Sequence, residues 1–227
     1  MIEFTNVTKT YPNGTKALKN IDLRINDGEF VFIVGASGAG KTTLSKLLLR
    51  EEKITSGKLV IDGFNLGKMP QYKVSRLRRT MGIVFQDFRL LPNMTAFENI
   101  AFAMHVVGEP NKVIKTRVEK FLQLVNLEDK ANAYPHEMSG GEQQRIALAR
   151  AIINNPKMII ADEPTGNIDP YMSIEMMDLL VKINKLGKTV IVITHEKSIV
   201  DYYQKRVVTI SDGQITSDRT GGMFDEN

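Results

Sequence analysis

The sequence predicts an α/β fold in which helices pack against a mostly parallel sheet. Four short apolar runs rich in Val, Ile and Phe occur at 30–34, 81–85, 158–161 and 189–194. Continuous apolar runs, rather than alternating ones, are typical of strands that are covered on both faces. Helical patterns separate these runs, and alternation of strand with helix along a chain favours this fold class.

The helical patterns have the amphipathic period of surface helices, and they span roughly 41–50, 95–107, 112–126, 142–154 and 171–186. Gly187 stands where a glycine that ends a helix belongs. The first 28 residues instead alternate and are split by the turn signal "PNG", which predicts an antiparallel ribbon. Residues 57–63 look like a further strand of that layer.

Composition limits the class of protein. The chain has 227 residues, 42% of them hydrophobic and 25% charged, which suits one large globular domain. It has no cysteine, so disulfides, thiolate nucleophiles and cysteine-zinc sites are excluded and a reducing compartment is expected. The first residues lack the pattern of a signal peptide, and the apolar runs are too short to span a bilayer. We therefore expect a cytoplasmic chain.

The charge pattern argues against a nucleic-acid partner. The formal net charge is only +4, and the basic residues are scattered rather than gathered on one face. The densest basic cluster is interpreted as a solvated helix face, with contact to anionic lipid as the alternative; it consists of Lys73, Arg76, Arg78 and Arg79.

Polar groups follow each of the four apolar runs. The first leads into Gly35–Thr42, the second into Gln86, the third into Asp162 and Glu163, and the fourth into His195. In open α/β sheets, ligands bind beyond the carboxyl ends of the strands. The sequence thus predicts that four strands deliver these groups to one edge.

The segment "GASGAGKT" matches G-x-x-x-x-G-K-[ST] between a strand and a helix. Its glycines let backbone N–H groups turn toward phosphate oxygens, Lys41 reaches the β and γ phosphates, and Thr42 offers its hydroxyl to Mg²⁺. A glycine-rich strand-to-helix turn is the alternative. The predicted phosphate-binding residues are Gly35, Ala36, Ser37, Gly38, Ala39, Gly40, Lys41, Thr42 and Thr43.

The two carboxylates point to opposite faces of their strand and so take different roles. Asp162 is the candidate to hold Mg²⁺, and Glu163 the one to deprotonate an attacking water; an acidic turn after the strand is the alternative. His195 is the candidate to hydrogen-bond the γ-phosphate, and Gln86 the one to contact the metal or the water. The expected metal set is Thr42, Gln86 and Asp162.

A second glycine-rich helix start occurs at "SGGEQ". Ser139 and Glu142 form the S-x-x-E pattern of a capping box. A well-capped helix with a buried stripe of Ile146, Ala149 and Ile153 does not explain Gly140 and Gly141, since glycine is costly in a first helical turn. The paired glycines predict a second phosphate site at the positive end of this helix.

Tyr11 lies in the turn of the ribbon. It is the candidate to stack on a purine, and an ordinary turn aromatic is the alternative.

Taken in order, these motifs are similar to those of the ATPase subunits of ABC transporters over essentially the whole chain. The residues that carry the resemblance are Tyr11, Gly35–Thr42, Gln86, Ser139–Gln143, Met158–Glu163, Asn167–Asp169 and His195. The family implies a P-loop NTPase (RecA-like) core with a mostly parallel sheet, an N-terminal antiparallel β layer and an inserted α-helical lobe. Two departures from its pattern, Met138 and Ile168 in place of leucine, remove no catalytic group.

The resemblance also implies ATP and Mg²⁺ as cofactors and a homodimer in the ATP-bound state. Ser139, Gly140, Gly141 and Glu142 would then contact the ATP held by the partner subunit, and Asp169 would couple the two sites. It divides one ABC ATPase domain, 2–227, into three segments. These are 1–87 with the β layer and the first part of the nucleotide-binding core, 88–137 as the helical lobe, and 138–227 with the signature helix and the rest of the core.

Within the family, Arg50-Glu51-Glu52 and Asp87–Leu90 resemble the subunits that act in bacterial cell division and activate peptidoglycan hydrolysis through a transmembrane partner. Such a subunit is peripheral on the cytoplasmic face of the cell membrane. ATPase subunits of lipoprotein-releasing or macrolide-type exporters are the alternative within the family.

Two other functional classes fit less well. A switch GTPase requires N-K-x-D, but "NKLG" at 184–187 has glycine in place of the aspartate and precedes a strand. A soluble ABC protein acting on ribosomes or DNA usually has two ATPase halves in one chain or a long coiled-coil insertion. Neither pattern is seen in this sequence, so this class is disfavoured.

One apolar cluster and the C-terminal end also carry structural expectations. The apolar residues Phe97, Ile100, Ala101 and Met104 either fill the core of the lobe or floor a groove for a partner helix. The polar end after Ser217 is expected to be loosely held.

Overall fold

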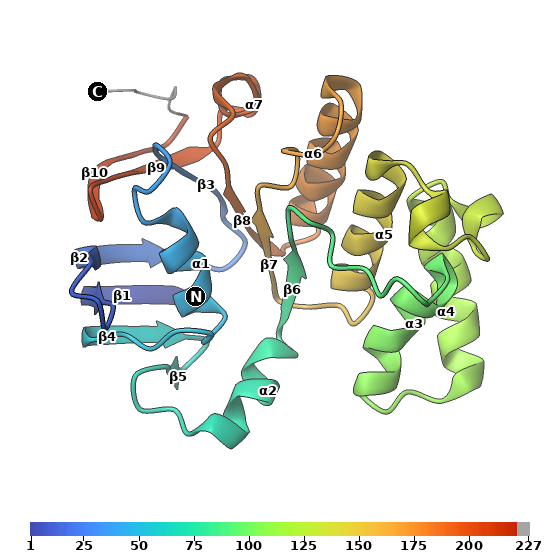
Figure 1. Ribbon diagram of the computed structural model, residues 1–227, viewed down its shortest axis with the longest axis horizontal. Coiled ribbons are helices and arrows are strands. Elements are labelled where there is room, and N and C mark those ends of the chain that lie inside the picture. The colour runs from blue at the N-terminus through green and yellow to red at the C-terminus, as the bar shows by residue number, and fades with distance from the viewer. Residues whose placement is uncertain (222–227) are drawn as a thin grey trace. The chain divides into compact units, whose positions relative to one another are not determined.

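The computed structural model describes residues 1–221, which divide into two compact units. The first unit comprises Met1–Arg78 and the chain from Val181 onward, and the second comprises Arg79–Leu180. Each unit contains strands and helices (Figure 1). Each also has a set of fully buried apolar side chains of its own.

The first unit contains the predicted antiparallel layer. Its central strand pairs antiparallel with a neighbour on each side, and Ile2, Phe4 and Val7 of that strand are buried. The alternating pattern of the first 28 residues therefore forms the ribbon predicted for it. In spatial order the layer consists of β2 (Lys16–Ile25), β1 (Ile2–Thr10), β4 (Ser56–Ile61) and β5 (Phe64–Asn65).

The first unit also contains a parallel group of strands. β3 (Phe30–Val34) pairs in parallel with β8 (Thr189–Ile193) on one side and with β9 (Arg206–Ser211) on the other, and every residue of β3 and β8 is buried. This burial on both faces is what the continuous apolar runs predicted.

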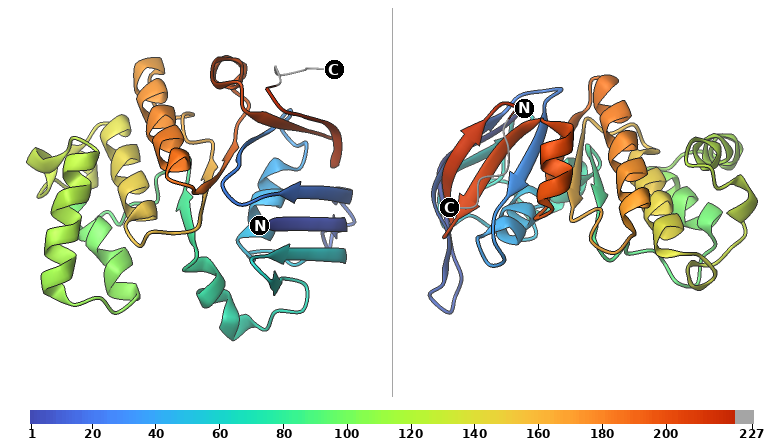
Figure 2. Two further views of the ribbon diagram at one scale, coloured as in Figure 1. Left: turned by 180° about the vertical axis from the view of Figure 1, so that it is seen from behind. Right: turned by 90° about the horizontal axis from the view of Figure 1, so that it is seen from above.

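The C-terminal hairpin was not predicted. β10 (Gln214–Arg219) pairs antiparallel with β9 and is largely exposed, so it lacks the apolar run that marks the other strands (Figure 2). The expectation of a loosely held end after Ser217 is wrong for Asp218 and Arg219, because these residues lie in β10. The rest of that expectation falls partly on residues 222–227, which lie outside the described residues.

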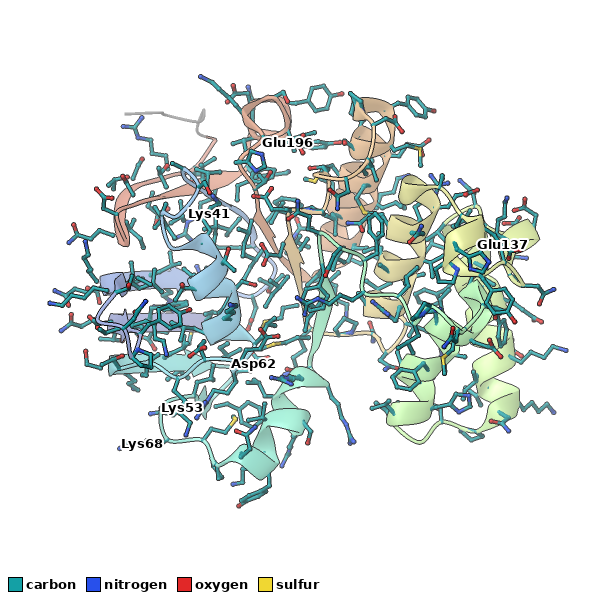
Figure 3. All side chains as sticks on the ribbon, in the orientation of Figure 1. Lys41, Lys53, Asp62, Lys68, Glu137 and Glu196 are labelled. Atoms are coloured by element: carbon teal, nitrogen blue, oxygen red, sulfur yellow. The ribbon has the colours of Figure 1, made fainter. Side chains whose placement is uncertain are left out.

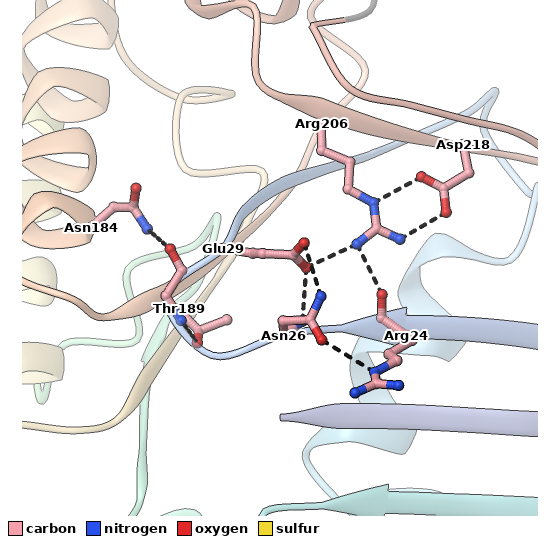
Figure 4. Close-up of polar contacts among 8 residues, drawn as sticks. Arg24, Asn26, Glu29, Asn184, Thr189, Arg206 and Asp218 are labelled. Carbon is pink, nitrogen blue, oxygen red and sulfur yellow. Dashed lines mark hydrogen bonds and ion pairs between the residues drawn. The ribbon is translucent and has the colours of Figure 1, made fainter.

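Arg206 fastens this hairpin (Figure 4). Its guanidinium donates two hydrogen bonds to the carboxylate of Asp218, at 2.8 and 2.7 Å, and one to Glu29 at 2.8 Å. The hydrogen bond with Asp218 raises the pKa of Arg206 above its ordinary value, with a smaller opposing effect of burial. A bidentate pair of this kind fixes direction as well as charge, so β10 is held on β9, while the bond to Glu29 holds β9 beside the start of β3.

The helices of the first unit are α1 (Lys41–Leu48), the 3₁₀ turn η1 (Gln71–Lys73), α2 (Val74–Arg78) and α7 (Lys197–Tyr203). In α2, Val74 and Leu77 are buried, whereas all four members of the basic cluster are exposed. This exposure is what a solvated face requires, and it is equally compatible with the alternative of contact to anionic lipid. Among residues 1–221, no helix has both the length and the apolar character needed to cross a bilayer.

The second unit is built on a parallel strand pair with helices around it. The strands are β6 (Met81–Val84) and β7 (Met158–Asp162), which pair in parallel. The helices are α3 (Ala96–Val106), α4 (Asn111–Leu124), α5 (Gly140–Ile152) and most of α6 (Pro170–Lys185), with 3₁₀ turns η2 (Glu128–Lys130) and η3 (Pro135–Glu137). α6 ends at Lys185, and Gly187 just beyond it has a φ of +84° and donates a hydrogen bond to the Asn184 carbonyl, which matches the predicted helix stop.

The apolar residues of α3 form a core rather than a groove. Ile100, Ala101 and Met104 are buried among side chains of α4 and α5, and Phe97 packs against the same cluster. The hypothesis that they floor a docking groove is therefore wrong for Ile100, Ala101 and Met104, whose side chains are buried in the core of the lobe, whereas Phe97 is only partly buried.

We expect Ile100→Ala to lower the free energy of unfolding by about 2–5 kcal/mol, because it leaves a cavity among fully buried neighbours. Urea unfolding measures this loss. Val106→Ala on the same helix removes a side chain that is half-exposed and should cost less than about 1 kcal/mol. Equal losses for the two variants would contradict the core assignment.

Candidate functional site

The first unit holds the glycine loop, Gly35–Gly40, between β3 and α1. Gly35 has a φ of +153°, and a Cβ there would collide with the carbonyl oxygen of Ile210. Gly40 has a φ of +115°, and a Cβ there would lie 2.7 Å from the carbonyl oxygen of Ala17. Only glycine fits both positions, so backbone packing fixes the course of the loop.

Lys41 directs its ammonium into this loop (Figure 3). The side chain is buried, and Nζ donates hydrogen bonds to the carbonyl oxygens of Gly35, at 2.6 Å, and Ala36, at 3.0 Å. Ala36, Ser37 and Gly38 at the tip are exposed. A held ammonium beside the N-terminus of α1 favours a bound anion.

Tyr11 lies next to α1. Its backbone N–H donates to the carbonyl oxygen of Thr15 at 2.9 Å, which closes the predicted turn. The phenol oxygen lies 3.3 Å from the hydroxyl oxygen of Thr43, and the Nζ atom of Lys9 lies 4.9 Å from the ring centroid. The structure thus joins Tyr11 to the first turn of the helix that begins at Lys41.

His195 leaves the parallel strands at the same edge as the glycine loop. Ile33 of β3 is paired with Ile193 of β8, and the backbone N–H of Thr194 donates to the carbonyl oxygen of Ile33 at 3.1 Å. Gly35 and the exposed His195 each lie two residues beyond this pair. For these two groups, the expected delivery to one edge is found within the first unit.

The second unit brings its own polar groups to one edge. Val84 of β6 is paired with Ala161 of β7, so Gln86 lies just beyond one strand while Asp162 and Glu163 end the other. Glu163 has a φ of +48°, in the left-handed region, which costs a non-glycine residue roughly 1–2 kcal/mol. Strain of this kind persists only where surrounding contacts enforce it.

Hydrogen bonds hold the segment that contains Glu163. We define residues 163–169 as the acidic-turn segment. The side-chain amide of Asn167 donates to the backbone carbonyl of Gln86 at 2.9 Å. Gln144, fully buried in α5, donates to the carbonyl oxygen of Pro164 at 2.7 Å. No role was predicted for Gln144, because its motif is local while its partner, Pro164, is 20 residues away along the chain.

The N-terminus of α5 has the predicted capping box. Ser139 Oγ accepts from the N–H of Glu142 at 3.3 Å, and Glu142 Oε2 accepts from the N–H of Ser139 at 2.7 Å. The predicted buried stripe of this helix, Ile146, Ala149 and Ile153, is confirmed.

The paired glycines of α5 allow close packing. A Cβ on Gly140 would lie 3.0 Å from the carbonyl oxygen of Asn167, and one on Gly141 would collide with the side chain of Met172. Packing against the acidic-turn segment and the start of α6 thus accounts for a pair of glycines that capping alone left unexplained. A phosphate contact at this helix start stays a prediction.

Two acidic side chains here serve helix ends. Asp169 Oδ1 accepts from the N–H groups of Tyr171, at 3.0 Å, and Met172, at 3.1 Å, so it caps α6. The backbone hydrogen bond from Ser139 lowers the pKa of Glu142 below its ordinary value of 4.5, against a smaller effect of burial. Both carboxylates are thereby held in fixed positions.

The residues expected to hold Mg²⁺ fit that ion chemically. Thr42, Gln86 and Asp162 all offer oxygen atoms, and Mg²⁺ binds oxygen ligands while keeping several waters and phosphate oxygens in its shell. Magnesium binding remains a proposal for this chain.

Comparison with known proteins identifies close relatives. The family model described as ABC transporter matches residues 18–166. The chain is 51% identical to the "Cell division ATP-binding protein FtsE" of Bacillus subtilis (strain 168), covering 99% of this chain and 98% of the relative. It is 50% identical to the protein of the same name from Streptococcus pneumoniae serotype 2, covering 99% and 97%.

A solved structure has the same fold. It is a dimeric structure of a post-hydrolysis state of the ATP-binding cassette MJ0796 bound to ADP and Pi, with a TM-score of 0.89 and 36% sequence identity, covering 99% of this chain and 100% of that one. The predicted α/β fold class is confirmed.

We expect the stabilising effect of the Glu142 charge to depend on pH. Because its pKa is lowered on folding, the carboxylate contributes stability above the pKa of the unfolded chain and loses it as the pH falls through the lowered value. Glu142→Gln removes the charge and keeps a capping side chain. By urea unfolding, parent and variant should differ by about 0.3–1 kcal/mol at neutral pH. A difference that stays constant below pH 4.5 would contradict this expectation.

Proposed function

This chain belongs to the ATP-binding proteins of the ABC transporter family, and we propose that its ATPase activity drives a cell-division complex at the membrane. The observation that carries this proposal is full-length similarity to proteins named FtsE, together with a complete set of the motifs that ATP hydrolysis needs. The chain would act as FtsE does with the transmembrane protein FtsX, at the cytoplasmic face of the cell membrane, to activate peptidoglycan hydrolysis.

The glycine loop would hold the phosphates of ATP. Lys41 already has its ammonium among the carbonyls of the loop, where an incoming phosphate oxygen would replace them as its partner. Thr42 would contribute a hydroxyl to Mg²⁺, and Thr43 would contact the phosphates beside it. Tyr11 would stack on the adenine, since its ring is tied to Thr43 at the start of α1.

The second unit would supply the hydrolytic groups. Glu163 would take the proton from the attacking water, and Asp162 and Gln86 would contact Mg²⁺. The enforced left-handed conformation of Glu163 supports its assignment, because backbone strain clusters at functional positions. His195 would donate a hydrogen bond to the γ-phosphate.

A second copy of the chain would complete each site. Ser139, Gly140, Gly141 and Glu142 would contact the ATP of the partner subunit, and Asp169 would link the two sites. The dimeric structure of the ATP-binding cassette MJ0796 supports a homodimer, and we propose that this chain dimerises when ATP is bound. Within this chain, the contact between Gly140 and Asn167 joins the start of α5 to the segment that follows Glu163.

We expect Glu163→Gln to bind ATP and to accumulate as an ATP-dependent dimer, while its turnover falls about 10²- to 10⁴-fold through loss of the general base. Phosphate release and size-exclusion chromatography measure the two effects. Lys41→Ala should lose ATP binding itself. The exposed Glu119→Gln is a matched control and should keep the parent rate. A Glu163→Gln variant that turns over ATP at the parent rate would remove the base assignment.

The membrane partner would contact the exposed apolar face of α3. Phe102 and Val106, four residues apart, are 43% and 51% exposed and lie on one side of the helix whose other side fills the core of the lobe. Exposed apolar side chains grouped in this way favour contact with a protein partner.

We expect Phe102→Asp to abolish co-purification with FtsX from detergent extracts while ATPase activity is kept, because a charge would enter the apolar contact. Leu124→Asp, at a 53% exposed position of α4, is the matched control and should co-purify normally. Unaltered co-purification of Phe102→Asp rules out this face as the contact.

A further inference from the structure

Lys9 is a buried charge on the core face of a strand. In β1 it follows Val7 on the side that packs inward, and only 7% of the residue is exposed. Taking an ammonium out of water is costly, so a buried lysine requires partners. Its position in a strand of the antiparallel layer gives it no part in the sequence motifs described above.

Two partners hold this ammonium. Lys9 Nζ lies 2.7 Å from a carboxylate oxygen of Glu52, and 4.9 Å from the ring centroid of Tyr11. The hydrogen bond from Lys9 lowers the pKa of Glu52 below its ordinary value, which favours the charged carboxylate beside the ammonium. Glu52 belongs to the segment Arg50-Glu51-Glu52 that marks this chain within its family, which gives that segment a physical role.

The ring of Tyr11 is therefore fixed from two directions. Lys9 lies over its ring within the range of a cation–π interaction, and its hydroxyl lies 3.3 Å from that of Thr43 in α1. The turn from Tyr11 to Thr15 fixes the backbone that carries the ring. An aromatic ring has two faces, so a cation on one of them leaves the other for a flat ligand.

We propose that Lys9, held by Glu52, is a positioning residue that orients the Tyr11 ring for stacking on the base of ATP. The inference rests on the proposed role of Tyr11 and adds a residue that does not itself touch the nucleotide. It predicts that the effect of Lys9 is confined to the base and does not extend to the phosphates.

The test compares two probes that share a triphosphate and differ in the base: ATP and inorganic tripolyphosphate, titrated by calorimetry without Mg²⁺ so that ATP is not hydrolysed. Lys9→Met should weaken ATP binding about three- to tenfold and leave tripolyphosphate binding unchanged within about twofold. Lys9→Arg keeps a cation that stacks on aromatic rings and should restore ATP binding. Glu52→Gln should weaken ATP binding in the same direction, and it serves as the second variant if Lys9→Met does not fold.

Lys53→Met is the matched control, since Lys53 is exposed in the same segment as Glu52 (Figure 3). It should bind both probes as the parent does. Tyr11→Leu distinguishes the positioning role of Lys9 from the stacking role of Tyr11. If Tyr11→Leu weakens ATP binding but Lys9→Met does not, the positioning role of Lys9 is overturned, while the proposed stacking of Tyr11 on the base is supported. If Tyr11→Leu has no effect on ATP binding, the stacking role of Tyr11 and the positioning role of Lys9 are both overturned. An equal loss of ATP and tripolyphosphate binding in Lys9→Met also overturns the positioning role.

Discussion

Contact between backbone segments, with no side chains between them, fixes the glycine loop of the first unit. The carbonyl oxygen of Ile210 occupies the space that a Cβ on Gly35 would need, and that of Ala17 does so for Gly40 and Gly213. Gly213 in turn donates its N–H to the carbonyl oxygen of Ala39 at 2.9 Å. The start of β2, the turn between β9 and β10 and the loop itself therefore hold one another through main-chain atoms. A loop fixed in this way has its N–H groups oriented before any anion arrives, which is the condition for strong binding without reorganisation.

In the second unit, side-chain amides hold the segment that follows Glu163 in place. Glu163 adopts a left-handed conformation, and the acidic-turn segment that follows it is anchored by Gln144 from α5 and tied to Gln86 through Asn167. Hydrogen bonds from amides to main-chain carbonyls are directional and carry no charge, so they position the segment without altering the electrostatics of its carboxylates. The start of α5 packs on the same segment through its glycines, so displacement of either one is felt by the other.

The parts of this structure that follow local rules could be predicted from the sequence. Continuous apolar runs marked β3 and β8, and the S-x-x-E pattern marked the capping box at Ser139. The hairpin of β9 and β10 was not predicted, because β10 is exposed and alternates only weakly. Its place depends on the long-range pairing of Arg206 with Asp218. The same limit applies to the sites: the loop at Lys41 is a contiguous motif, whereas the link from Gln144 to Pro164 joins residues 20 apart that only the fold brings together.

Two buried or partly buried cations, Lys9 and Arg150, hold neighbouring segments in position at a cost in the free energy of folding. Lys9 is buried beside Tyr11, and the partly buried Arg150 donates to the carbonyl oxygens of Phe88, at 2.8 Å, and Arg89, at 2.7 Å. Phe88 and Arg89 both have left-handed φ angles, and burial lowers the pKa of Arg150. An apolar side chain of similar size would generally be as stable or more stable at such sites. Each cation instead holds a segment next to a residue proposed to contact ATP or its metal, Tyr11 in one unit and Gln86 in the other. Directional contacts from a fixed charge are what an apolar side chain cannot supply, which explains why a lysine and an arginine occupy these two positions.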